Sequence, residues 1–226
     1  MTDRTILITG ASTGIGAETA RAAASAGWKV ALAARSADKL KALVDEIGPD
    51  RAKAIEADVT DEADVARMVE EAAAFGPLHA AFANAGLGAT VPGAEEGETA
   101  NWRQMIDTNI WGLVLTVKYA LPHLKQVKGH MLLTGSQAGR KTLPGSVYGA
   151  TKWFVHGFGE NLREEMKEWG GRCTVIAPGM VDTPFFDEPK PGALTGEDVA
   201  RAVVHALEQP AHVNTGEVFL TPIMPA

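Results

Sequence analysis

The chain has 226 residues, of which 46% are hydrophobic and 22% charged, and this composition is too apolar for a disordered protein. The formal net charge of -7 argues against a dedicated nucleic-acid binder, which usually has a basic surface. The single cysteine, Cys173, excludes an intrachain disulfide, and no apolar run approaches the roughly 20 residues of a membrane span. We therefore expect a soluble cytoplasmic protein with one domain over residues 1–226 and neither a nucleic-acid nor a membrane partner.

Short apolar runs alternate with longer stretches of helical periodicity. In chain order, the pattern predicts a strand at 6–9, a helix at 14–26, a strand at 29–34, a helix at 37–47, a strand at 52–57, a helix at 61–75, a strand at 78–83, a helix at 101–124, a strand at 129–134, a helix at 146–169, a strand at 172–177, a loop at 179–196, a helix at 197–209 and a strand at 217–221. This alternation predicts an α/β fold, with right-handed crossovers and a parallel sheet of about seven strands covered by helices on both faces.

The first predicted strand runs into a glycine-rich turn at residues 9–16, before the first helix. In a doubly wound sheet this turn binds the pyrophosphate of a dinucleotide, and the free N–H groups of the helix attract the anion. Gly10 allows the sharp turn, Gly14 lets the backbone approach the phosphates, and Gly16 lets the helix pack close to the strand. The residues expected at this site are Gly10, Ser12, Thr13, Gly14, Ile15 and Gly16.

The end of the second predicted strand indicates the form of the cofactor. Binders of NAD normally carry an acidic residue here that holds the ribose of the adenosine, and this chain has Arg35 and Ser36 instead. Arg35 can form charge-assisted hydrogen bonds with a 2′-phosphate, and Ser12 and Ser36 can add hydroxyl donors. The alternative is a solvated Arg35 that only ends the strand. The pattern favours NADP(H) over NAD(H).

Four polar residues suggest acid–base chemistry near this cofactor. Tyr148 and Lys152 are four residues apart on one predicted helix face, and a nearby ammonium group favours the phenolate, so we expect Lys152 to lower the pKa of Tyr148 from its usual value of about 10. Ser136 follows the fifth predicted strand, at the sheet edge where ligands bind, and can donate to a substrate oxygen. Asn109 can bind a backbone carbonyl or a water molecule and link Lys152 to solvent. Each could also be an ordinary surface or turn residue.

Taken together, these motifs resemble the short-chain dehydrogenase/reductase family over nearly the full chain. They are residues 9–16, Asp58-Val59, Asn84-Ala85-Gly86, Asn109, Ser136, the segment 148–152 and the segment 178–183. Many members have a second Asn where this chain has Ala83.

The resemblance implies a single-domain Rossmann-type fold and an NADP(H)-dependent oxidoreductase acting on a small alcohol or carbonyl compound, namely a ketone, an aldehyde or a 3-hydroxy/3-oxo acid. It implies a catalytic tetrad of Asn109, Ser136, Tyr148 and Lys152, with Tyr148 as the general acid or base. The further cofactor contacts that it implies are Asp58 and Val59 at the adenine, Asn84, Ala85 and Gly86 at the cleft, and Pro178, Gly179, Val181 and Thr183 at the nicotinamide end. Tyr148 and Lys152 are also expected to contact the cofactor, with Lys152 at the nicotinamide ribose. It also implies a homodimer or homotetramer.

The substrate is expected under a short lid at about residues 180–196. The expected substrate residues are Ser136, Gln137, Arg140, Tyr148, Met180, Phe185 and Phe186, with Arg140 able to meet a substrate carboxylate. The six histidines show no metal-ligand spacing, so no metal site is expected. Two other functions remain open: an NADP(H)-binding regulator or sensor with little turnover, and a sugar-nucleotide enzyme of the related extended type. The intact tetrad argues against the first, and the short segment after Gly179 argues against the second.

Overall fold

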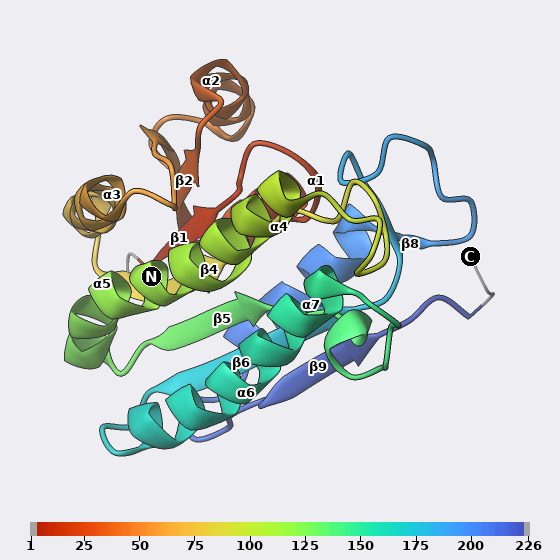
Figure 1. The fold of residues 1–226 in the computed structure, drawn as a ribbon. Coiled ribbons are helices and arrows are strands. Elements are labelled where there is room, and N and C mark those ends of the chain that lie inside the picture. The colour runs from red at the N-terminus through yellow and green to blue at the C-terminus, as the bar shows by residue number, and fades with distance from the viewer. Residues whose placement is uncertain (1–3, 224–226) are drawn as a thin grey trace.

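The computed structural model describes residues 4–223, so the first and last three residues of the expected domain lie outside the described part. Seven parallel strands form one sheet in the order β3-β2-β1-β4-β5-β6-β9. The strands are β1 (Thr5–Thr9), β2 (Lys29–Ala34), β3 (Ala52–Glu56), β4 (Leu78–Ala83), β5 (His130–Thr134), β6 (Arg172–Pro178) and β9 (Glu217–Leu220). The predicted α/β fold with a doubly wound parallel sheet is therefore confirmed (Figure 1).

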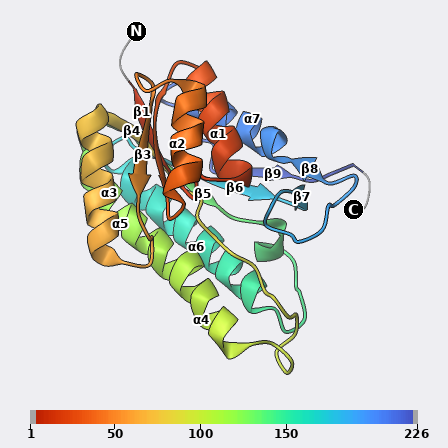
Figure 2. The ribbon, with the colours of Figure 1, turned by 90° about the horizontal axis from the view of Figure 1, so that it is seen from above.

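Helices cover both faces of the sheet, as Figure 2 shows from above. One apolar cluster joins the sheet to α1 (Gly14–Ser25), α2 (Ala37–Ile47) and α7 (Gly196–Leu207). A second cluster joins the opposite face to α3 (Glu62–Phe75), α5 (Leu113–Val127) and α6 (Val147–Lys167). The central strands are apolar on both faces because both faces are covered, and β1 is buried at every position.

The predicted helix at 101–124 is continuous but not uniform. It consists of α4 (Thr99–Ile106), a π-helical segment η1 (Asp107–Gly112) and α5, with helical backbone angles at both junctions. Side-chain periodicity does not reveal one wider turn inside a long helix, so the sequence did not show it. Such turns are rare and occur frequently at functional sites.

The segment predicted as a loop at 179–196 contains two short parallel strands, β7 (Val181–Asp182) and β8 (Leu194–Thr195). They join the two ends of the lid, and the backbone N–H of Leu194 donates to the Met180 carbonyl at 3.0 Å. The lid then leads directly into α7, where Thr195 and Asp198 cap the helix reciprocally. Figure 1 shows this segment beside the carboxyl ends of β5 and β6. No helix within residues 4–223 is both long and apolar enough to cross a lipid bilayer.

Candidate active site

A cavity of about 350 Å³ lies at the carboxyl edge of the sheet. Its walls come from the turns that follow β1, β2, β3, β4, β5 and β6, together with the start of α6 and the lid. This is the place where doubly wound sheets bind ligands, because the strand order reverses there and the loops diverge. The expected site residues in its lining are Gly10, Ser12, Thr13, Gly14, Ile15, Arg35, Ser36, Asp58, Val59, Asn84, Ala85, Gly86, Ser136, Tyr148, Lys152, Pro178, Gly179, Val181, Thr183, Phe185 and Phe186.

The glycine turn is fixed by hydrogen bonds between the ends of neighbouring strands. The Thr9 hydroxyl accepts from the backbone N–H groups of Asn84 at 2.9 Å and Ala85 at 3.1 Å. The Asn84 amide donates to the Thr9 carbonyl at 3.0 Å and accepts from the Thr134 hydroxyl at 3.1 Å. These bonds tie β1, β4 and β5 together at the cavity floor, so the turn that starts at Gly10 has a fixed position.

The three glycines of the turn have different surroundings. Gly10 and Gly14 have φ angles of +64° and +53°, which favour glycine. A Cβ on Gly14 would lie 3.2 Å from the Thr183 side chain of the lid, and one on Gly16 would overlap the Gly10 carbonyl. Gly16 is buried beneath the cavity and does not line it, in agreement with its expected packing role. The cavity therefore meets the backbone at the start of α1, whose first turn has no acidic residue.

Arg35 and Ser36 lie at the end of the cavity formed by the turn after β2. Both are exposed, and Arg35 forms no hydrogen bond or ion pair with another residue in the range 4–223. Asp58 and Val59 lie on the adjacent wall. The Asp58 carboxylate accepts hydrogen bonds from the backbone N–H and the hydroxyl of Thr60, at 2.9 and 2.8 Å, so its orientation is fixed within its own turn.

Ser136 and Tyr148 meet on the opposite side of the cavity. The Ser136 hydroxyl oxygen accepts from the Ala138 backbone N–H at 3.1 Å and faces the Pro178 carbonyl at 3.5 Å. Burial raises the pKa of Tyr148, and its side-chain hydrogen bond with Ser136 acts in the opposite direction. The expectation that Lys152 lowers this pKa is wrong for the protein alone, because desolvation of the phenolate is the larger effect and Lys152 is not among the causes of the shift.

Lys152 is buried, and its Nζ donates to the Thr134 carbonyl at 2.8 Å. The ammonium lies 5.8 Å from the centre of the Tyr148 ring. Burial lowers the pKa of Lys152 to about 8, because the low-dielectric surroundings disfavour the charged form. The side chain is therefore held at the floor of the cavity, below Tyr148, with a proton that can be lost near neutral pH.

Asn109 lies in η1 and holds the turn after β4. Its side chain accepts from the Leu87 N–H and donates to the Leu87 carbonyl, both at 2.9 Å, and it donates to the Thr151 hydroxyl at 3.2 Å. It thus binds a backbone carbonyl, one of the two partners expected for it. A Cβ on Gly86 would lie 3.2 Å from the Asn109 oxygen and 3.7 Å from Lys152 Nζ, so Gly86 lies between these two side chains.

Three expected substrate residues lie outside the lining. The Arg140 guanidinium binds Glu217 at 2.7 Å and Glu160 at 3.0 Å, so it is neutralised by the chain itself and does not face a substrate. Gln137 lies beside Gly179, and Met180 is 37% exposed on the lid. The expectation that Arg140 meets a substrate carboxylate is therefore wrong.

Aromatic side chains form the lid side of the cavity. The ring centres of Phe185 and Tyr148 are 5.9 Å apart, and those of Phe185 and Phe186 are 5.2 Å apart. Sequence reasoning missed Thr134 and Leu87, which also line the cavity. Thr134 had a usable signal, since it is the last residue of a strand and precedes Ser136 by two positions, whereas Leu87 depends on the η1 contact with Asn109.

Comparison with known proteins agrees with this geometry. Residues 4–192 match the family model of the short-chain dehydrogenases. The chain is similar to an uncharacterized oxidoreductase of Staphylococcus saprophyticus, with 36% identity over 98% of each chain. The chain belongs to the short-chain dehydrogenase family and is an oxidoreductase of that family.

Solved structures give the same result. An alcohol dehydrogenase from the archaeon Thermococcus sibiricus, complexed with 5-hydroxy-NADP, has a TM-score of 0.90 and 30% identity over 99% of each chain. A 3-ketoacyl-(acyl-carrier-protein) reductase from Brucella melitensis, complexed with NADH, has a TM-score of 0.89 and 28% identity over 97% of this chain and 96% of that one. Both forms of the nicotinamide cofactor therefore occur among the similar structures.

Proposed function

We propose that this protein is an NADP(H)-dependent oxidoreductase that interconverts a small carbonyl compound and its alcohol, with Tyr148 as the general acid or base. One observation carries the proposal. A single cavity joins the glycine turn and Arg35 at one end to Ser136, Tyr148 and Lys152 at the other. A dinucleotide binder without chemistry would not need a buried lysine beside a tyrosine ring.

The residues present fit a phosphorylated dinucleotide. Gly14 leaves space beside Thr183 that a Cβ would fill, and the first turn of α1 carries no acidic residue to repel a pyrophosphate. Arg35 has no acidic partner among the described residues, so its charge is available for a 2′-phosphate. Ser12 and Ser36 add hydroxyl donors. When bound, the nicotinamide would supply or accept the hydride.

The chain's own residues would bind and polarise the substrate oxygen. Ser136 and Tyr148 would both donate hydrogen bonds to a carbonyl oxygen, which withdraws electron density from its carbon. Tyr148 would deliver the proton to that oxygen in reduction or remove it in oxidation. Lys152 would hold the nicotinamide ribose and keep positive charge near the phenolate. Asn109 would act on Lys152 through the turn at Gly86.

Burial of Tyr148 suits the acid that carbonyl reduction requires. Because desolvation raises its pKa, the hydroxyl stays protonated at neutral pH and is ready to act as an acid. Oxidation needs the phenolate, which the positive charges of Lys152 and of an oxidised nicotinamide would stabilise.

The lid favours uncharged substrates among the expected classes. Phe185 and Phe186 present aromatic rings to the cavity beside Tyr148. Arg140, the cation expected to bind a carboxylate, is held by Glu217 and Glu160. Ketones and aldehydes therefore fit this wall better than 3-oxo acids do.

The test is NADPH and NADH consumption with small ketones, aldehydes and 3-oxo acids, measured for the wild type and for Tyr148→Phe. We expect turnover with NADPH and an uncharged carbonyl compound, and a loss of roughly 10²- to 10⁴-fold in kcat in the variant. Tight NADPH binding without turnover on any compound would instead favour the regulator or sensor. A preference for NADH would contradict the role given to Arg35.

Assembly into a homodimer or homotetramer is part of the proposal. Exposed aromatic side chains lie on the neighbouring η1 and α6, with Trp111 at 46% and Trp153 at 49% exposure. Large exposed apolar patches commonly mark subunit interfaces. Light scattering after gel filtration would test this, and a monomer at micromolar concentration would contradict it.

A further inference from the structure

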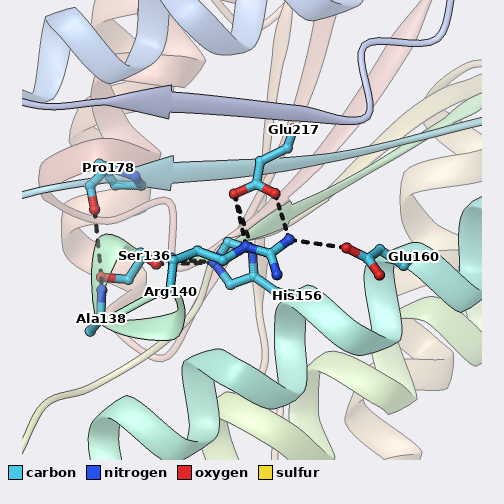
Figure 3. Close-up of polar contacts among 7 residues, drawn as sticks. All are labelled: Ser136, Ala138, Arg140, His156, Glu160, Pro178 and Glu217. Atoms are coloured by element: carbon cyan, nitrogen blue, oxygen red, sulfur yellow. Dashed lines mark hydrogen bonds and ion pairs between the residues drawn. The ribbon is translucent and has the colours of Figure 1, made fainter. Parts of the chain in front are cut away.

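A buried histidine lies directly behind Ser136. His156, on α6, is 1% exposed, and its Nε2 is 3.0 Å from the Ser136 backbone carbonyl oxygen. Its Nδ1 is 3.3 Å from a carboxylate oxygen of Glu217, on β9. Figure 3 shows the imidazole between Glu217 and the turn that carries Ser136. The histidine thus joins the edge strand of the sheet to the backbone of a candidate catalytic residue.

Nε2 faces the Ser136 backbone at its carbonyl oxygen, at 3.0 Å, and at its N–H, at 3.5 Å, whereas Nδ1 faces the Glu217 carboxylate. A neutral imidazole has one N–H, so it can donate to the Ser136 carbonyl or approach Glu217 as a donor, but not both. With the proton on Nδ1, the ring donates toward Glu217 and Nε2 accepts from the Ser136 N–H. Without that pairing, His156 Nδ1 is a buried nitrogen with no hydrogen-bond partner among the described residues. The geometry therefore fits an imidazole ring held between the Ser136 backbone and Glu217.

Arg140 completes the cluster from the turn after β5. Its guanidinium donates to both carboxylate oxygens of Glu217, at 2.7 and 3.3 Å, and to Glu160 at 3.0 Å. Burial alone would raise the pKa of Glu217, but the hydrogen bond from Arg140 and the charges of His156 and Arg140 lower it below its usual value. Arg140 thus favours the charged form of Glu217, whose carboxylate faces His156 Nδ1.

The turn around Ser136 has no free space on the His156 side. A Cβ on Gly135 would lie 2.9 Å from His156 Nε2, and one on Gly139 would lie 2.5 Å from the imidazole and 2.6 Å from the Lys152 carbonyl carbon. The backbone from Gly135 to Gly139 therefore packs directly on the ring. Loss of the ring would leave a hole behind the serine that neighbouring side chains fill only partly.

We propose that His156, held by Glu217 and Arg140, is a positioning residue that fixes Ser136 for its contact with the substrate oxygen. It acts through the Ser136 backbone, so it would affect kcat more than cofactor binding. This inference rests on the proposed function for its kinetic consequence, but the claim that His156 holds the turn is independent of turnover.

The test compares three variants of the full chain. His156→Leu removes both ring nitrogens, whereas His156→Gln keeps an amide N–H that can reach the Ser136 carbonyl. His130→Leu is the matched control, because His130 is equally buried but lies at the amino end of β5, where its Nε2 meets the Thr174 hydroxyl at 2.7 Å. Hydrogen exchange over residues 134–140, NADPH affinity and kcat are measured for each, and kcat is measured again in a Ser136→Ala background.

We expect His156→Leu to speed exchange over residues 134–140 and to lower kcat by about 10- to 100-fold, because small displacements of a catalytic group can cost that much. NADPH affinity should stay within twofold. His156→Gln should recover most of the loss, and His130→Leu should change neither exchange in this segment nor kcat by more than about twofold. In the Ser136→Ala background, loss of His156 should cost less than twofold, since residues that act through one another are not additive.

An equal loss of kcat in both backgrounds would overturn the proposal, as would unchanged exchange over residues 134–140 in His156→Leu. If the wild type turns over no substrate, the proposed function fails, and the exchange comparison alone still decides whether His156 holds the Ser136 turn.

Discussion

The two walls of the cavity are built in different ways. The strand-end wall consists of the turns after β1 and β4, where Thr9 and Asn84 join the strands by hydrogen bonds. There, backbone packs against backbone, and a Cβ on Gly10 would lie 2.9 Å from the Ala85 Cα. The lid wall consists of Phe185 and its neighbours. Phe185 is 44% exposed, and its contacts are with rings and with the tip of the turn at Gly88.

This difference separates two requirements of the proposed reaction. The same dinucleotide is bound in every turnover, so a rigid wall can hold its phosphates and ribose in one place. Substrates vary in shape, and an exposed aromatic side chain can change rotamer at little cost. The strand-end wall should therefore tolerate almost no substitution, whereas the lid wall should tolerate many.

The largest effect is expected at the base of the strand-end wall. In Gly16→Ala, the new methyl group would overlap the Gly10 carbonyl and lie 2.9 Å from the Ala11 Cα, and neither can move without opening the turn. We expect loss of NADPH affinity by more than about 100-fold or loss of the fold, since backbone shifts of this kind cost about 1–3 kcal/mol or more. Calorimetry and thermal unfolding would measure both.

The matched control is Gly157→Ala. It adds the same methyl group to an exposed position of α6, where no atom lies within 4 Å of the new carbon. It should leave NADPH affinity unchanged and stabilise the helix by about 0.5–1 kcal/mol. Equal effects of the two substitutions would remove the distinction between a rigid wall and an ordinary helix surface.

The second effect concerns Lys152, whose Nζ donates to the Thr134 carbonyl at the cavity floor. Burial lowers its pKa to about 8, so the unfolded chain binds more protons than the folded one between pH 8 and the ordinary lysine value. Stability from this group should therefore rise with pH across that window, by on the order of 3 kcal/mol in total. Urea unfolding of the free protein at pH 7 to 10 would measure the rise, and Lys152→Met should lack it. If the unfolding free energies of the wild type and of Lys152→Met changed in parallel with pH, the assignment of the lowered pKa to Lys152 would be contradicted.

A smaller effect is expected in the turn after β2, beside the strand-end wall. Arg35 lines the cavity but is exposed, so Arg35→Ala should leave the fold intact. We expect KM for NADPH to rise roughly ten- to hundredfold, because hydrogen bonds to charged groups contribute about 1.5–3 kcal/mol. KM for NADH should stay within twofold. The control is Lys39→Ala, which removes an exposed charge from α2 outside the lining of the cavity. An equal rise in KM for NADPH in Arg35→Ala and Lys39→Ala would show that Arg35 is not part of the site.

The smallest effect is expected at the lid wall. In Gly88→Ala, the new carbon would lie 2.8 Å from the tip of the Phe185 ring, which is exposed and can turn aside. We expect KM for the carbonyl substrate to change by no more than about threefold and NADPH affinity not to change, since a rotamer shift costs about 0.5–1.5 kcal/mol. Steady-state kinetics would measure both. A loss of NADPH affinity as large as that expected for Gly16→Ala would show that the lid wall is also rigid.

The sequence predicted the strand-end wall well because its signals are local. Glycines at a strand-to-helix turn, and polar residues directly after buried strands, specify both an element and a place at the sheet edge. Asp61, the first residue of the predicted helix at 61–75, does cap α3, and its carboxylate accepts from the Asp64 N–H at 3.0 Å. For such residues, position along the chain nearly determines position in space.

The sequence predicted less where the answer depends on a distant partner. Arg140 was expected to face the substrate, but Glu217, 77 positions away, binds it. The direction of the Tyr148 pKa depended on burial, which spacing along a helix does not reveal. The role of His156 was invisible for the same reason, since its partners come from the turn after β5 and from β9.

The π-helical turn in η1 limits the length of the segments that can be exchanged between this protein and its relatives. Met105 before it and Leu113 after it are both buried, and Gly112 within it approaches Val59 closely enough that a Cβ would lie 2.8 Å from that side chain. Each residue of a helix advances its face by about 100°. A graft that changed the residue count between Met105 and Leu113 by one would therefore turn the apolar face of α5 away from the sheet. Length across this segment, more than the identity of its residues, limits which chimaeras can fold.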